Sequence, residues 1–317
     1  MCFTQAPKTG RLAALATLFG WLATAAAATA QERPSVVAAS KTDLLTMTPQ
    51  WKGDRLPDGR PKVSDDLLKR MRNISTEDTW ELLRKYGYDN QFEGGWKMLN
   101  PDEVFVGRAL TAAYLPSRPD LQEHIVRGGQ SEGRIGRPNS WPIDMLQKGD
   151  VYVADGFGKI IDGTLIGDNL GNAIFAKTGT GVVFYAAARD LEGLRRIKGF
   201  NAAVRDFDPS EIKGMLLTSI NKPIRIGRAV VMPGDIVLAR RIGVVFIPAH
   251  LAEEVVSTGE IIAIKDEFGH MRLREGKYTP GQIDSKWSDA IKADFFEWYK
   301  SRKNNPPIPL AEIEKHL

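Results

Sequence analysis

Residues 167–191 read GDNLGNAIFAKTGTGVVFYAAARDL and decide the fold of this chain. Residues 173–177 have the apolar spacing of a helix, which Gly179 and Gly181 end. Residues 182–185 follow as a β-branched and aromatic run, which is typical of a buried strand. The stretch therefore predicts a loop–helix–strand unit of an α/β fold.

This unit also predicts a site. Twenty residues separate Asp168 from Arg189, so the unit brings Asp168 and the pair Arg189 and Asp190 to the carboxyl end of the strand, where α/β folds bind ligands. Two carboxylates and a guanidinium suit a hard divalent cation and an anionic, oxygen-rich substrate. Two other interpretations stay open, because an Arg–Asp pair is also a common surface ion pair and Asp168 is also suited to cap a helix.

The spacing of these residues resembles the D-x20-R-D signature of the RraA-like family, which includes metal-dependent 4-hydroxy-4-methyl-2-oxoglutarate aldolases. Three further blocks resemble family strands in the family's order, at residues 107–112, 149–156 and 233–239. The resemblance covers roughly residues 63 to 265. It implies an α/β domain of the swivelling β/β/α type that assembles as a homotrimer or a dimer of trimers.

The resemblance implies a divalent-metal-dependent lyase. It would cleave a 4-hydroxy-2-oxo acid to pyruvate or decarboxylate oxaloacetate, in both cases through a metal-stabilised enolate. Asp190 offers a hard oxygen ligand for Mg²⁺ or Mn²⁺, and Arg189 would hold a substrate carboxylate and neutralise the enolate. Asp168 would position a proton-shuttling water. The backbone amides of Asn169 and Leu170 would bind the substrate carboxylate.

Some family members supply a further acid from an adjacent subunit, for which Glu267 is the nearest candidate here. The alternative function is a non-catalytic binding protein, like the family's regulators of ribonuclease activity. Those regulators lack the first aspartate of the signature, so Asp168 counts against this alternative. A methyltransferase is disfavoured because no glycine-rich S-adenosylmethionine loop is visible, and the four histidines lack the spacing of zinc ligands.

Residues 1–30 read as a signal peptide. Lys8 and Arg11 precede an apolar core at 12–22, and Ala28-Thr29-Ala30 offers a cleavage site. A membrane anchor is the competing interpretation, but the core is short for a span. We expect a periplasmic or secreted protein without a stable membrane anchor. Cys2 leaves with the signal, so the mature chain has no cysteine for disulfides or thiol chemistry.

Charge excludes one class of partner. Removal of the signal lowers the formal net charge from +4 to +2. Such a near balance argues against electrostatic binding of nucleic acid. The partner that the family resemblance implies is instead a small oxo acid.

The flanking segments carry weaker signals. Residues 31–62 predict an extended arm, rich in Pro–Gly turns, that Trp51 anchors to the body or to a neighbouring subunit. Ser64 and Ser75 are placed to cap two helices, and residues 104–115 predict a strand. Residues 116–148 predict a long polar loop as an insertion, rich in Gly and Pro around residues 128–138. This insertion is either a lid or subunit contact carrying Arg134 or Arg137, or a solvated surface excursion.

The C-terminal half predicts further strands and two helices. A helix is expected from residue 251 to about 265, followed by a C-terminal extension at 266–317 with a last helix at 287–300. Trp287, Ile291, Phe295 and Trp298 recur at helical spacing and indicate core or subunit packing. The expected strands lie at 151–155, 159–161, 200–204, 223–226, 229–232, 236–239 and 244–248.

Overall fold

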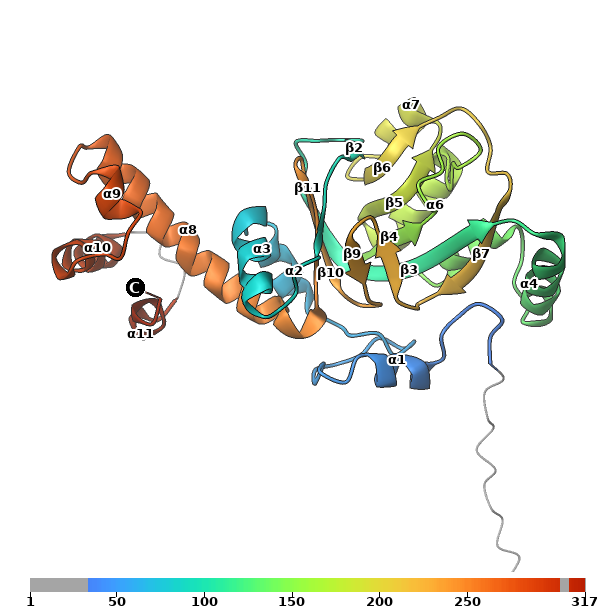
Figure 1. The fold of residues 1–317 in the computed structure, drawn as a ribbon, viewed down its shortest axis with the longest axis horizontal. Coiled ribbons are helices and arrows are strands. Elements are labelled where there is room, and N and C mark those ends of the chain that lie inside the picture. Colours follow the sequence, from blue (N-terminus) through green and yellow to red (C-terminus); the bar gives the residue numbers. More distant parts are fainter. Residues whose placement is uncertain (1–33, 303–307, 317) are drawn as a thin grey trace, which may run out of the picture. The chain divides into compact units, whose positions relative to one another are not determined.

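The computed structural model describes residues 34–302 and 308–316, so the predicted signal peptide lies outside the described residues. Within them, nine strands form one mixed sheet in the order β1-β11-β10-β3-β4-β5-β6-β2, with β7 paired to β3 (Figure 1). Strands β3 to β6 run parallel, and the other pairings of this sheet are antiparallel. This arrangement confirms the predicted α/β class. The bounds are β1 Phe92–Glu93, β2 Lys97–Met98, β3 Phe105–Pro116, β4 Asp150–Asp155, β5 Gly181–Ala188, β6 Asn201–Phe207, β7 Met215–Ile220, β10 Ile236–Arg240 and β11 Gly243–Ile247.

The two faces of the parallel strands enter different hydrophobic cores, because successive side chains of a strand point to opposite sides. Tyr152 and Phe184 pack in one core with Ile174 of helix α6 (Asp168–Thr178). Val153 packs in the other core with Ile226 of a small hairpin, formed by β8 (Ile224–Ile226) and β9 (Ala229–Val231). Helix α6 therefore covers one face of the parallel strands, and the hairpin covers the other.

The helices predicted at Ser64 and Ser75 are confirmed. Helix α2 (Asp65–Met71) begins after Ser64, whose side chain accepts a hydrogen bond from the Leu67 amide. Helix α3 (Thr76–Lys85) begins after Ser75, which accepts from the Asp78 amide. Each serine satisfies an amide that the helix leaves without a partner. Both helices contact α8 (Ala252–Arg274), and together they enclose a third hydrophobic core beside β10 and β11.

Helix α8 runs further than we expected. The prediction ended it near residue 265, but it continues through Gly259 and residues 266–274 without a break. Phe268 explains the continuation, because it is buried against Trp287 and Phe295 in a fourth core. The apolar face of the last helix is confirmed as core packing. This C-terminal part comprises the end of α8 with α9 (Pro280–Ile283), α10 (Asp289–Ser301) and α11 (Leu310–Glu314).

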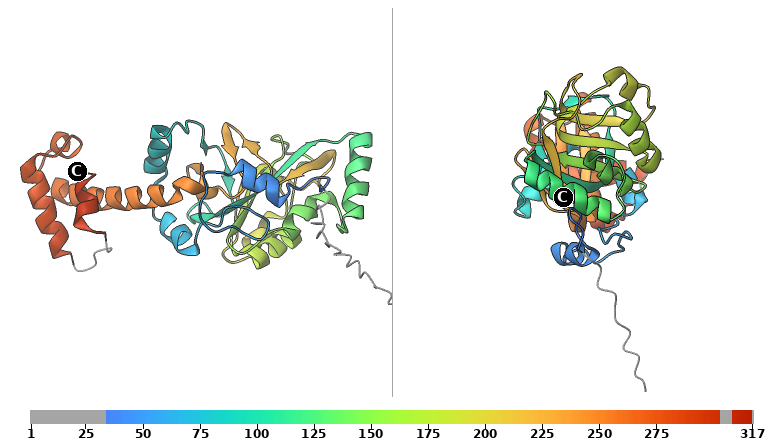
Figure 2. Two further views of the ribbon diagram at one scale, coloured as in Figure 1. Left: turned by 90° about the horizontal axis from the view of Figure 1, so that it is seen from below. Right: turned by 90° about the vertical axis from the view of Figure 1, so that its right-hand side faces the viewer.

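Residues 116–148 are mainly helical, so the expectation of a long loop is wrong. They form α4 (Pro119–Ser131), a 3-10 turn (Pro138–Ser140) and α5 (Trp141–Asp144). Glycines in α4 suggested a loop, but Gly129 serves close packing, since a Cβ there would lie 2.2 Å from the Trp141 ring. Figures 1 and 2 show α4 beside the ends of β3 and β7.

Two other local expectations are also wrong. Residues 34–62 are not simply an extended arm, because they include α1 (Lys41–Met47) and bury Leu44 and Arg60 completely. Trp51 packs against the core beside α2 and α3, as predicted for an anchor to the body. Residues 159–161 do not form a strand, because Lys159 and Ile160 are irregular and a turn begins at Ile161, where Asp162 follows with a φ of 58°.

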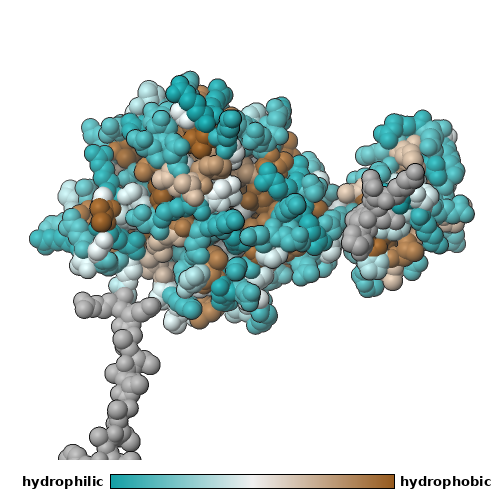
Figure 3. Space-filling model, turned by 180° about the vertical axis from the view of Figure 1, so that it is seen from behind, coloured by the Kyte–Doolittle hydropathy of each residue, from teal (hydrophilic) through white to brown (hydrophobic). Residues whose placement is uncertain are grey.

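In the part of the chain that the structure describes, no helix is both long and apolar enough to cross a bilayer. Figure 3 shows a face on which hydrophilic residues surround separate hydrophobic patches. Such scattered patches are ordinary for a folded domain.

Candidate functional site

All the residues predicted to form the site except Glu267 line one pocket of about 310 Å³. Asp168, Asn169 and Leu170 form the first turn of α6, and Arg189 and Asp190 directly follow β5. The loop–helix–strand unit therefore has the geometry that the sequence predicted. The chemical roles of these residues remain predictions.

Backbone hydrogen bonds hold the two halves of the pocket together. The loop before α6 runs alongside the end of β5, where the Leu165 amide donates to the Ala187 carbonyl at 3.0 Å. The Arg189 amide donates in turn to the Ile166 carbonyl, also at 3.0 Å. These bonds place the start of α6 beside Arg189 and Asp190 and make the pocket a preformed feature of the fold.

Asp190 adopts an unusual conformation. Its φ of 58° and ψ of 44° lie in the left-handed region, which non-glycine residues seldom occupy. It precedes helix α7 (Leu191–Arg195), yet its side chain makes no capping hydrogen bond to that helix. Its Oδ2 atom instead lies 3.4 Å from the Asp168 amide, at the positive end of the α6 dipole. Strain of this kind is characteristic of functional sites.

Glycines make room for both aspartates. A Cβ on Gly167 would lie 2.2 Å from Asp190 Oδ2, and a Cβ on Gly193 would lie 2.5 Å from Asp168 Oδ2. Gly167 is also the N-cap of α6, so Asp168 is the first helical residue and not the cap. The amides of Asn169 and Leu170 lie in the first turn, where a helix offers them no partner of its own. They are suited to bind an anion.

Arg189 belongs to a loose chain of charges across the pocket. Its Nε lies 3.6 Å from Asp190 Oδ2, and its Nη1 lies 3.8 Å from Glu211 Oε1. The other oxygen of Glu211 lies 3.7 Å from Arg137 Nη1. Because these separations exceed hydrogen-bond length and the groups are partly exposed, a ligand can displace the pairs at small cost.

Glu211 was missed by the sequence analysis. It lies in an irregular segment after β6, the parallel neighbour of β5, so both strands deliver residues to the same edge of the sheet. Arg137, one of the two arginines singled out in residues 116–148, lines the pocket. The other, Arg134, pairs with Glu132 and stacks on Trp141, which gives it a structural role.

Glu267 does not reach this pocket within the chain. It lies on α8, where its carboxylate pairs with Arg302. A contribution from an adjacent subunit stays a prediction.

The pocket fits a hard cation that takes few protein ligands. Among residues 34–302 and 308–316, no group of three or more His, Cys, Asp or Glu side chains is arranged to hold a metal ion. Mg²⁺ and Mn²⁺ do not require one, since a single carboxylate completed by water and substrate oxygens is a common arrangement. Asp190 suits this role because it lines the pocket, its side chain is partly exposed and it makes no capping bond to α7.

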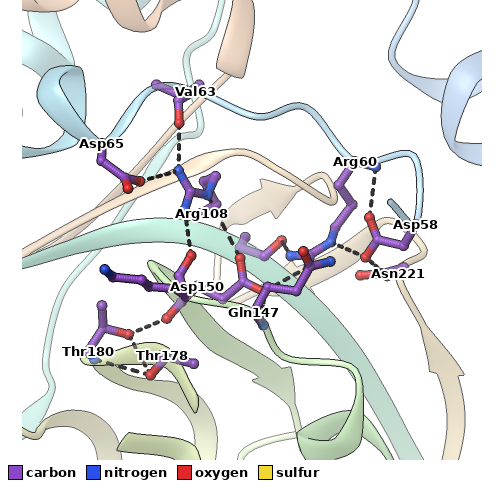
Figure 4. Close-up of polar contacts among 12 residues, drawn as sticks. Asp58, Arg60, Val63, Asp65, Arg108, Gln147, Asp150, Thr178, Thr180 and Asn221 are labelled. Atoms are coloured by element: carbon purple, nitrogen blue, oxygen red, sulfur yellow. Dashed lines mark hydrogen bonds and ion pairs between the residues drawn. The ribbon is translucent and has the colours of Figure 1, made fainter. Parts of the chain in front are cut away.

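A second Asp–Arg cluster lies at the opposite end of the parallel strands (Figure 4). Arg60 Nη2 lies 2.8 Å from Asp150 Oδ2 at the start of β4, and both side chains are fully buried. Arg60 also bonds Asp58 at 2.7 Å, and Arg108 Nη1 donates to the Val63 carbonyl at 2.6 Å. These bonds tie the segment before α2 to β3 and β4.

Burial and charge oppose each other in this cluster. Burial disfavours the charged guanidinium, but the carboxylates of Asp150 and Asp58 outweigh it and raise the pKa of Arg60. Burial raises the pKa of Asp150, although Arg60 and Arg108 act against this rise. Because Arg60 and Asp150 are fully buried and paired with each other, the cluster serves the fold, although Asp150 Oδ1 and Arg108 Nε, 3.9 Å apart, have no hydrogen-bond partner among the described residues.

The chain is similar to known proteins in its sequence and in its fold. The chain matches the family described as RraA-like, Aldolase/RraA, over residues 61–246. Protein DlpA of Legionella pneumophila is 26% identical over 205 residues, which make up 64% of this chain and 31% of that protein. The chain thus spans about a third of the length of that relative.

Two solved structures share the fold. RraAS2 of Streptomyces coelicolor, described as an unusual member of the RNase ES inhibitor RraA protein family, is 22% identical with a TM-score of 0.57, covering 67% of this chain and 100% of that one. An uncharacterized protein from Pseudomonas syringae pv. tomato is 21% identical with a TM-score of 0.57, covering 70% of this chain and 98% of that one.

Proposed function

This chain belongs to the RraA-like family, which includes aldolases and non-catalytic regulators, and we propose that it is a divalent-metal-dependent lyase. Its substrate is a 4-hydroxy-2-oxo acid of the 4-hydroxy-4-methyl-2-oxoglutarate type, cleaved to pyruvate, or oxaloacetate, which is decarboxylated. The observation that carries the proposal is the pocket in which the strained Asp190, Arg189 and the first turn of α6 converge.

The two reactions break the same bond and pass through the same enolate. In each, the bond between C3 and C4 of the oxo acid breaks and its electron pair stays on C3, which gives the enolate of pyruvate. The enolate then takes a proton at C3. In the aldol cleavage the C4 hydroxyl loses its proton as it becomes a carbonyl, whereas in the decarboxylation C4 leaves as carbon dioxide.

Each residue has a role that follows from its position. Arg189 binds the substrate carboxylate and compensates the negative charge of the enolate, and the amides of Asn169 and Leu170 bind the substrate carboxylate. Asp168 holds the water that moves the proton. Asp190 would hold Mg²⁺ or Mn²⁺. When bound, the cation supplies Lewis-acid chemistry that favours negative charge on the substrate oxygens.

The test is pyruvate release by the purified protein from 4-hydroxy-4-methyl-2-oxoglutarate and from oxaloacetate, with Mg²⁺ and with EDTA. We expect turnover with Mg²⁺ that EDTA and Asp190→Ala each abolish. Glu192→Ala is the matched control, because this exposed acid lies two residues away and outside the pocket. Absence of pyruvate release from both substrates, together with absence of Mg²⁺ binding, would overturn the proposal and favour a non-catalytic binding protein.

We further propose that the protein is a homotrimer or a dimer of trimers, and that it is exported to the periplasm or beyond. Light scattering on the purified protein tests the assembly, and a monomer would contradict it. N-terminal sequencing of the protein recovered from the cell envelope tests export, for which we expect the mature chain to begin at Gln31.

A further inference from the structure

A second pocket lies directly beside the candidate site. Its volume is about 400 Å³, and it shares Arg137, Asn139 and Ile212 with the site pocket. The two spaces therefore meet at one wall that is built from the segment after α4 and the segment after β6. Figures 1 and 2 show α4, which contributes to the second pocket, at the ends of β3 and β7.

The second pocket differs from the first in chemistry. The site pocket is lined by Asp168, Arg189, Asp190 and Glu211, whereas the second has the partly exposed Val126, Pro138 and Met215 in its wall, with Lys213 beside them. Tyr114 lies behind this wall as a core residue, with its hydroxyl bonded to that of Tyr152 at 2.9 Å. Ser117 and Gln122, also in the wall, bond each other at 2.9 Å.

Arg137 stands where the two pockets meet. It has one ion pair, to Glu211 at 3.7 Å, and three quarters of its side chain is exposed. Asn139 is fixed beside it, because its side-chain amide donates to the Leu165 carbonyl at 3.2 Å in the loop that leads to α6. The junction is thus tied to the same loop that positions Asp168.

We propose that the second pocket binds the tail of the substrate. The substrate class is then a 2-oxo acid whose carboxylate and keto group occupy the site pocket and whose alkyl or aryl substituent packs against Val126, Pro138 and Met215. This inference rests on the proposed lyase function. Cleavage between C3 and C4 of such a 4-hydroxy-2-oxo acid gives pyruvate and an apolar aldehyde or ketone, with the hydroxyl proton lost at C4 and one proton gained at C3.

Binding of unreactive ligands separates the two pockets. Oxalate fits the polar pocket alone, whereas 2-oxobutanoate and 2-oxooctanoate share one head group and differ by four methylene groups. We expect calorimetry in the presence of Mg²⁺ to show that 2-oxooctanoate binds about tenfold or more tightly than 2-oxobutanoate, because each buried methylene adds to affinity.

Variants of Val126 test whether the second pocket causes the gain in affinity for the long tail. Val126→Trp fills the second pocket, so we expect it to remove the advantage of the long tail and to leave oxalate binding unchanged. Ile135→Trp is the matched control, since this residue is 83% exposed and lines neither pocket. Val126→Ala keeps the test available if the tryptophan disturbs folding, and we expect a loss of about threefold for 2-oxooctanoate alone.

The outcomes distinguish the inference from the function on which it rests. If oxalate binds but the long tail brings no gain, or the gain survives in Val126→Trp, the tail pocket is wrong and the lyase proposal stands. If neither oxalate binding nor pyruvate release is found, the lyase proposal fails and the tail pocket falls with it. A gain that Val126→Trp removes and Ile135→Trp keeps supports the inference.

Discussion

An Asp–Arg pair lies at each end of the parallel strands, and the two pairs differ in burial and in the distance between the charged groups. At the start of β4, the side chains of Arg60 and Asp150 are 0% exposed and 2.8 Å apart. After β5, the side chains of Arg189 and Asp190 are 37% and 43% exposed and 3.6 Å apart. The first pair is closed to any ligand, whereas the second is open to one.

The difference separates stability from function. An exposed pair contributes only about 0–1 kcal/mol to folding, so stability does not account for the strained backbone of Asp190. A buried pair supports the fold only while both partners are present, because removal of one partner leaves the other charge buried without compensation. The same two residue types therefore serve the fold at one end of the strands and, in our account, chemistry at the other.

The largest effect is expected from Arg60→Met. It leaves Asp150 buried without its main partner and should lower the free energy of unfolding by about 3–5 kcal/mol. Urea unfolding followed by tryptophan fluorescence measures this change. A loss below about 1 kcal/mol would show that the cluster is no more important to the fold than a surface pair.

The same substitution in the exposed pair of Arg189 and Asp190 should lower activity and leave stability almost unchanged. Arg189→Met removes the charge that binds the substrate carboxylate, so kcat/KM for pyruvate release should fall about 100- to 1,000-fold. The free energy of unfolding should change by less than about 1 kcal/mol. Equal losses of stability in Arg60→Met and Arg189→Met would break the comparison.

A third acid, Asp235, differs from Asp150 because it is buried without a cationic partner. Burial raises the pKa of Asp235 to about 7, and its carboxylate accepts a hydrogen bond from the Met232 amide at 2.8 Å. The folded state thus keeps a proton that the unfolded state loses near its pKa of about 3.9.

The stabilisation from this proton is full below about pH 4 and declines as the pH rises to about 7. Across this window, the difference in unfolding free energy between the wild type and Asp235→Asn should fall by about 1–3 kcal/mol. Urea unfolding of both proteins at several pH values measures it. A difference that stays constant with pH would mean that Asp235 is ionised in the fold.

The smallest effect is expected from one added methyl group. Gly167→Ala places a Cβ where Asp190 Oδ2 lies, 2.2 Å away, so the carboxylate must shift. We expect a roughly tenfold loss of kcat/KM, because small displacements of a catalytic group are costly, with little change in stability. Gly281→Ala is the control, since its added methyl group meets nothing within 4 Å. Unchanged activity in Gly167→Ala would mean that the position of Asp190 is not critical.

The sequence predicted the site pocket with Arg189 and Asp190 better than the buried cluster of Arg60 and Asp150. Asp168, Arg189 and Asp190 belong to one local unit whose helix and strand follow from apolar spacing, so their meeting could be inferred. Arg60 stands in a Pro–Gly-rich segment that resembles a linker. Its partners, the Ala109 carbonyl and the Asp150 carboxylate, lie 49 and 90 residues away, and no local pattern indicates them.

Two other misses have similar physical reasons. Glycine and proline content predicted a loop around residues 128–138, whereas packing against the Trp141 ring requires a small residue inside α4. Glu211 lies in an irregular segment, and only the parallel pairing of β6 with β5 brings it to the site. Tertiary contacts decided both outcomes.

The most direct test of the account is manganese binding, followed by electron paramagnetic resonance, in the wild type, Asp190→Asn and Asp150→Asn. We predict one Mn²⁺ site in the wild type whose signal oxalate alters. This site is lost in Asp190→Asn and kept in Asp150→Asn when the latter is measured under conditions in which it is folded. Binding that survives in Asp190→Asn would contradict the assignment of the open pair to function.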